Sequence, residues 1–307
     1  MLRQRTIKQS LSVEGIGLHT GKAVKLSLRP AAVDHGIRYY RLDFQPPAEL
    51  LNDPWRVNAI PLCTCLENVQ GVTLATVEHL NAALAGLGVD NIIIEVNGPE
   101  LPILDGSAFP WVSLLLQAGI EELDQPKQFL WVTEPVKVQE GDKWVEVHPQ
   151  KNFCVDCTID FDHPTLDEST QHYHFTFSTQ SFVQQISQAR TFGFMRDIVR
   201  LQAQGLCLGG NLACAVVLDD QQVLNPEGLR FPNELVRHKI LDAVGDLFMG
   251  GRQILGSVKA FKPGHALNNR LLRTLLSQCH SWKLAPLDAA NLFSLSDQDQ
   301  AIATGLA

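Results

Sequence analysis

The segment from Arg237 to Gly250, RHKILDAVGDLFMG, constrains the fold most because it combines apolar residues with polar groups at helical spacing. His238, Asp242 and Asp246 are four residues apart, so a helix places all three on one face. The residues between them form a wide apolar surface, which predicts a buried helix. A buried imidazole beside two carboxylates is costly unless a cation compensates their charge. The segment therefore favours a metal site.

Zinc suits such a helix because it accepts a His nitrogen and an Asp oxygen and keeps an open position when it is catalytic. The same spacing also occurs in surface ion pairs and capped core polar groups. A third ligand has to come from elsewhere. The order helix, Gly stop, strand, turn, helix occurs at 76–118 and again at 234–280, and superposing the two places His79 opposite His238. On its own, His79 also fits a hydrogen-bonded core histidine.

Composition limits the class of protein. The chain has 307 residues, 45% of them hydrophobic and 19% charged, and no apolar run long enough to span a bilayer, so we expect a soluble protein without a transmembrane segment. A net charge of -8 argues against a nucleic-acid partner. Seven scattered cysteines and the absence of a secretory signal favour the cytoplasm. We expect a monomer, with transient contact to a membrane surface left open.

The pattern of elements predicts an α+β fold in two similar halves. Residues 1–124 form a first β/α domain with a strand insert, and residues 130–285 form a second. The polar stretch 122–129 is the predicted linker, and the weakly periodic residues 286–307 are predicted to be a mobile tail. His19 lies at a Gly-rich turn, where it is either solvated, the favoured interpretation, or part of a site wall.

Several residues near the expected metal ligands suit proton transfer. Glu78, next to His79, is a candidate general base. His265 follows a strand-to-helix turn and is a candidate acid or cationic stabiliser, with Asp246 placed to orient it and raise its pKa. The apolar stretch that begins at Thr191 is either ordinary core, which its composition favours, or the wall of an apolar slot.

Long motifs carry a family resemblance. GIGLHTG, TVEHLNAALAGLGVDNIIIEVNGPELPILDGSA, ARTFGF, RHKILDAVGDL and KPGHALNN resemble the UDP-3-O-acyl-N-acetylglucosamine deacetylases, zinc amidases of the committed step of lipid A biosynthesis, over residues 3 to 280. The resemblance implies two layered β/α domains packed face to face, each with a small insert. The second insert, a βαβ unit near residues 191–218, would form a passage for the substrate's acyl chain.

The resemblance also implies a role for each matching residue. Zinc would be held by His79, His238 and Asp242, and catalysis would use Glu78, His265, Thr191 and Asp246. Substrate contacts would come from Phe192, Lys239, Asp160, Phe161, Lys262, Ile198, Leu212 and Cys214. Asp160 and Lys262 stand where the family more usually has Glu and Arg, and Leu212 stands where it can have a larger residue.

The implied reaction is hydrolysis of the N-acetyl group of UDP-3-O-(3-hydroxyacyl)-N-acetylglucosamine to the free amine and acetate, with one Zn²⁺ per chain. A zinc amidase for another acylated sugar nucleotide is the main alternative. A non-catalytic protein that binds a lipid or sugar nucleotide and a purely structural pair of α/β domains are the others, and the last predicts no metal.

Overall fold

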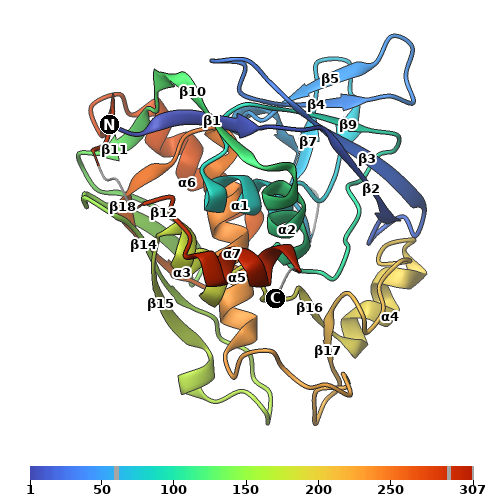
Figure 1. Ribbon diagram of the computed structural model, residues 1–307. Coiled ribbons are helices and arrows are strands. Elements are labelled where there is room, and N and C mark those ends of the chain that lie inside the picture. Colours follow the sequence, from blue (N-terminus) through green and yellow to red (C-terminus); the bar gives the residue numbers. More distant parts are fainter. Residues whose placement is uncertain (59–61, 289–291, 306–307) are drawn as a thin grey trace.

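The computed structural model describes residues 1–58, 62–288 and 292–305, which form a mixed α+β protein (Figure 1). One sheet has five strands. Residues of its inner strands alternate between buried and half-buried or exposed, as in a sheet with one face on the core. In order across the sheet, the strands are β2 (Leu11–Ile16), β3 (Ala23–Pro30), β9 (Ile92–Val96), β4 (Ile37–Arg41) and β5 (Ala48–Leu51).

A second sheet has seven strands and is organised around β18 (Ile254–Phe261). This strand runs parallel to two neighbours and antiparallel to a third. Its partners and the outer strands are β11 (Phe129–Val132), β12 (Val136–Glu140), β13 (Lys143–His148), β14 (Phe153–Thr158), β15 (His172–Thr176) and β19 (Trp282–Ala285).

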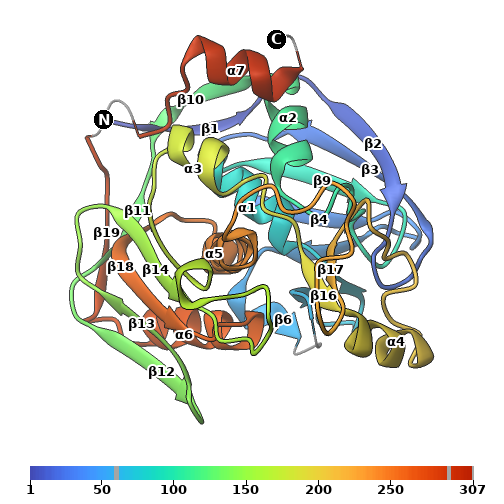
Figure 2. The same cartoon turned by 90° about the horizontal axis from the view of Figure 1, so that it is seen from below.

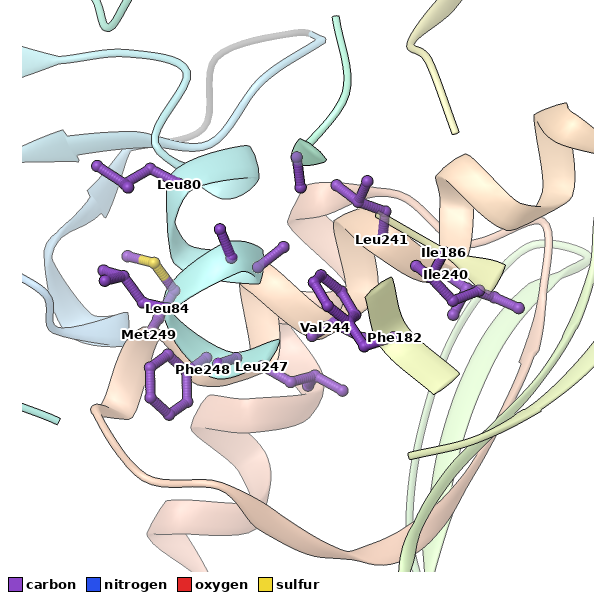
Figure 3. Close-up of a cluster of buried hydrophobic side chains, with 14 of the residues drawn as sticks. Leu80, Leu84, Phe182, Ile186, Ile240, Leu241, Val244, Leu247, Phe248 and Met249 are labelled. Atoms are coloured by element: carbon purple, nitrogen blue, oxygen red, sulfur yellow. The ribbon is translucent and has the colours of Figure 1, made fainter. Parts of the chain in front are cut away.

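Helices α1 (Glu78–Leu87) and α5 (Glu234–Leu247) lie between the two sheets (Figure 2). Every residue of α1 is buried, and its end at Gly88 is set by a left-handed backbone with φ 68°, as the Gly stop predicts. The Tyr39 hydroxyl of β4 donates to Asn81 Oδ1 of α1 at 2.8 Å, so α1 lies against the five-stranded sheet. Figure 3 shows the apolar core that α5 shares with α1 and α3 (Thr179–Gln185).

The two central helices touch through their backbones at Gly245. A Cβ atom there would lie 2.1 Å from the carbonyl oxygen of Glu78 and 3.1 Å from the backbone nitrogen of Ala82. Glycine inside a helix costs about 1 kcal/mol relative to alanine. At Gly245 this loss of helix stability allows the backbones of α1 and α5 to approach closely. The contact brings the two halves of the candidate site together.

Further elements surround this core. α2 (Phe109–Ala118) packs on α1, and α6 (His265–Ser277) packs on α5 and the seven-stranded sheet. Within the described ranges, every helix is too short or too polar to cross a membrane. The smaller strands and helices are β1 (Arg3–Ile7) with β10 (Ile120–Pro126), β6 (Val57–Asn58) with β7 (Cys65–Glu67) and β8 (Thr73–Leu74), β16 (Phe192–Phe194) with β17 (Val216–Leu218), α4 (Met195–Ala203), and the 3₁₀ turns Pro54–Arg56, Glu168–Thr170 and Phe248–Gly250.

The two segments predicted to be a linker and a mobile tail both contain regular secondary structure. The expected linker 122–129 contains most of β10, which pairs with β1, and Lys127 is buried against Asp90 and the ring of Phe293. The expected mobile tail, of which 289–291 and 306–307 lie outside the described residues, contains helix α7 (Asp297–Thr304) (Figure 1). The Phe293 ring stacks on that of Phe129. Both predictions rested on local polarity, whereas these contacts are with residues far away in the chain.

Candidate metal centre and active site

Two histidines and one aspartate converge where α1 meets α5. His79 is the second residue of α1, and His238 and Asp242 lie one turn apart on α5. One nitrogen of each imidazole and one oxygen of the carboxylate lie within 4.8 Å of one another, and all three residues are buried. His238 Nε2 is 3.3 Å and His79 Nε2 3.7 Å from Asp242 Oδ1. The sequence prediction that these three residues meet is therefore confirmed.

The hydrogen bonds around this group fit a cation. His238 Nδ1 donates to the Ala189 carbonyl at 3.0 Å, which leaves the lone pair of Nε2 facing the carboxylate. Asp242 Oδ2 accepts from Lys239 Nζ at 2.9 Å, but the buried Oδ1 has no donor among the described residues. A buried oxygen without a donor, facing imidazole lone pairs, is costly unless a cation lies between them. Two His nitrogens and a carboxylate oxygen are zinc ligands.

The protonation preferences of the three groups suit metal binding. Burial and the neighbouring His238 lower the pKa of His79 to about 3, so its imidazole is neutral. Burial also lowers the pKa of His238. Burial alone would raise the pKa of Asp242, but the nearby His238 and Lys239 outweigh it and hold that pKa well below its usual range. Neutral imidazoles and an ionised carboxylate are the forms that bind a metal.

A second set of polar groups lies next to the metal ligands. His265, the first residue of α6, has Nδ1 3.0 Å from Asp246 Oδ2 and Nε2 3.9 Å from Glu78 Oε1. Burial raises the pKa of Glu78 to about 8. Burial would lower the pKa of His265, but the charges of Asp246 and Asp242 outweigh it and raise that pKa to about 9. Because both pKa values lie above 7, both groups hold a proton at neutral pH when no cation is near; a cation at the His79, His238 and Asp242 group would lower the pKa of Glu78 and favour its ionised form.

The other residues expected at the site fall into two groups. Near the metal ligands, the Phe192 ring lies 6.2 Å from that of His238 and 5.6 Å from that of Phe161. Lys239 Nζ lies 5.4 Å from the centre of the Phe192 ring. The second group is centred on Lys262, which lies just after the end of β18. There, Lys262 Nζ is 2.8 Å from Asp160 Oδ2 and 2.7 Å from Asp142 Oδ2.

The remaining expected residues lie on the stretch that starts at Thr191. The Thr191 backbone bonds to Gly106 and to Val216. Ile198 lies against Gly193, and Cys214 is buried, whereas Leu212 is 38% exposed. No residue of α4 is buried, so this helix turns no face into the core. The composition-based preference for ordinary core is therefore wrong for α4.

Three other polar residues at the site were not singled out as site residues from the sequence. Thr64 and Asn268 both donate to Asp246. His19, for which a solvated turn was the favoured interpretation, is buried, and its backbone N–H donates to the buried Glu100 at 2.8 Å. That interpretation is wrong because Glu100, 81 residues away, folds the turn inward. Spacing could not reveal any of these contacts.

The fold and the site together define a metal-dependent hydrolase of the amidase type: a buried His, His, Asp group beside a carboxylate of raised pKa and a cationic imidazole. Residues 4–277 match the family described as LpxC: UDP-3-O-acyl N-acetylglycosamine deacetylase. The chain belongs to this family of zinc-dependent enzymes.

Two curated relatives are both named UDP-3-O-acyl-N-acetylglucosamine deacetylase. One, from Aliivibrio fischeri (strain ATCC 700601 / ES114), is 54% identical over 288 residues, and the alignment covers 94% of each chain. The other, from Sodalis glossinidius (strain morsitans), is 56% identical with the same coverage. The similarity therefore extends across both halves of the chain and is not confined to the site.

Proposed function

We propose that this chain hydrolyses the N-acetyl group of UDP-3-O-(3-hydroxyacyl)-N-acetylglucosamine to the free amine and acetate. His79, His238 and Asp242 would hold the zinc. The observation that carries the proposal is the buried Asp242 Oδ1, which lacks a donor among the described residues and faces two imidazole nitrogens. The family membership of the chain and the names of its relatives supply the substrate.

Zinc, when bound, supplies Lewis-acid chemistry that polarises a carbonyl oxygen and makes a water more acidic. Glu78 in its ionised form accepts the proton of the attacking water, and the burial that raises its pKa makes this carboxylate a stronger base than an exposed one. His265 carries a proton at neutral pH and stabilises the oxyanion, then protonates the departing amine. Asp246 holds the imidazole through Nδ1, which leaves Nε2 3.9 Å from Glu78 Oε1.

The substrate contacts are the roles that the family resemblance implies for the matching residues. Thr191 is assigned to the acetyl oxygen, and Lys239 and Phe192 to the diphosphate and glucosamine. Asp160, Phe161 and Lys262 are assigned to the nucleotide. The acyl chain is assigned to the apolar side of α4, with Ile198, Leu212 and Cys214 along it, because a helix with no buried residue can cover a lipid chain. Two pseudo-repeated domains, divided between residues 124 and 130, and a cytoplasmic monomer complete the proposal.

Acetate release from the acylated UDP-sugar tests the function. We expect turnover by the zinc-loaded protein, loss of turnover after chelation, and recovery when zinc is returned. The matched substrate lacks the uridine diphosphate and should be turned over more slowly. Equal rates on both substrates would favour a zinc amidase for other acylated sugars. Zinc binding without acetate release from either substrate would favour a non-catalytic binding protein.

A further inference from the structure

Thr64 links Glu78, the assigned base, to Asp246, the carboxylate that orients His265. It lies just before β7 and is buried, with 2% of its surface exposed. Its backbone N–H donates to Glu78 Oε2 at 3.0 Å. Its hydroxyl donates to Asp246 Oδ1 at 2.5 Å. One residue thus holds the carboxylate of the base and the carboxylate that orients the acid.

These two hydrogen bonds divide the oxygens of each carboxylate between different tasks. On Glu78, Oε2 is held by Thr64, while Oε1 faces His265 Nε2 at 3.9 Å. On Asp246, Oδ1 is held by Thr64, while Oδ2 accepts from His265 and from Asn268 Nδ2 at 3.0 and 2.9 Å. Three donors on two oxygens fix the plane of the Asp246 carboxylate, and through it the orientation of the imidazole.

The position of Thr64 is itself well defined. Its carbonyl accepts from the backbone N–H of Val77, the residue before α1, at 3.3 Å. Threonine is branched at Cβ, which restricts its χ1 rotamer and directs the hydroxyl. Asp246 lies 182 residues further along the chain, so the hydroxyl ties the short sheet of the first half to α5 of the second half.

We propose that Thr64 is a positioning residue for the hydrolysis: its hydroxyl holds Asp246 so that His265 presents Nε2 beside Glu78. The proposal rests on the function proposed above, in which His265 is the acid. Among the described residues, the side chain of Thr64 hydrogen-bonds to Asp246 and to none of the three proposed metal ligands. It acts through Asp246, so its contribution should vanish when His265 is absent.

Thr64→Val removes the hydroxyl and keeps the backbone N–H and the branched shape, whereas Thr64→Ser keeps the hydroxyl. We expect Thr64→Val to lower kcat for acetate release roughly 10- to 100-fold, the range for loss of a hydrogen bond to a charged group. KM and the zinc content measured by mass spectrometry should stay unchanged. Thr64→Ser should restore kcat to within about threefold of the parent, since its hydroxyl makes the same bond.

A double-mutant cycle separates positioning from general destabilisation. In a His265→Ala background, Thr64→Val should have no further effect on kcat. Wild-type kcat in Thr64→Val, or a full additional loss in the His265→Ala background, would overturn this inference and leave the proposed function standing. Full activity of His265→Ala would overturn both. Folding of each variant is checked by calorimetry. If Thr64→Val does not fold, Thr64→Ala replaces it in the same double-mutant cycle, and the same values of kcat decide the outcome.

Discussion

Replacement of Gly245 by alanine probes the closest contact between the two halves of the site. The added Cβ would lie 2.1 Å from the carbonyl oxygen of Glu78, which is 1.3 Å short of the 3.4 Å at which ordinary contact begins. The oxygen belongs to the backbone of α1, so no side chain can move aside, and the two helices have to separate. Glu78 and His79 lie on one helix and Asp242 on the other, so both base and metal ligands would shift.

The expected cost to activity exceeds the cost to stability. Overpacking typically costs about 1–3 kcal/mol, and alanine recovers about 1 kcal/mol of helix propensity, so we expect a net destabilisation of about 0–2 kcal/mol. A misplacement of about 1 Å can lower turnover roughly 10²-fold. Gly245→Ala should therefore fold, bind zinc more weakly and lose most of its activity.

Three measurements test this expectation: kcat for acetate release, zinc affinity by competition with a chelator, and the free energy of unfolding in urea. Gly250→Ala is the matched control, because a Cβ at that position meets no atom within 4 Å. It should leave stability within about 0.5 kcal/mol of the parent and activity intact. Wild-type turnover and zinc affinity in Gly245→Ala would refute the argument that this contact sets the site geometry.

Three further predictions concern the site itself. His265→Ala should lower kcat by roughly two to three decades with zinc retained, as for loss of one oxyanion donor; unchanged kcat would remove its assigned role. Asp246→Asn should move the alkaline limb of kcat/KM below about pH 9, because burial lowers the pKa of His265 and the Asp246 charge is the first of the groups that raise it to about 9. Only the protonated imidazole of His265 is active, so a lower pKa of His265 makes activity fall at a lower pH. An alkaline limb at the same pH as in the parent would contradict this prediction. Asp242→Asn should weaken zinc binding, measured by competition with a chelator. The loss should be at least roughly 10- to 100-fold, because that is the cost of losing a residue that only hydrogen-bonds to a metal ligand. Full zinc content at low free zinc would contradict the assignment of Asp242 as a ligand.

Much of this site could be predicted from local pattern. Helical spacing placed His238 and Asp242 on one face of a buried helix, and the Gly stop ended the first helix at Gly88, because both features depend on neighbours within a few residues. The weak internal repeat, together with the long family motifs, led to His79 as the third ligand. The α+β class also followed from the order of elements, whereas the division into two repeated domains stays a proposal.

Tertiary structure decided what depends on distant partners. Thr64 meets Asp246 across 182 residues, and Glu100 folds His19 inward across 81, so no local spacing predicts either contact. The polar stretch around Lys127 is held in place because β10 pairs with β1 and the Lys127 ammonium forms an ion pair with Asp90. Periodicity in a sequence specifies which face of an element is buried. Hydrogen bonds between side chains of different elements form only when those elements pack together, so the periodicity does not specify them.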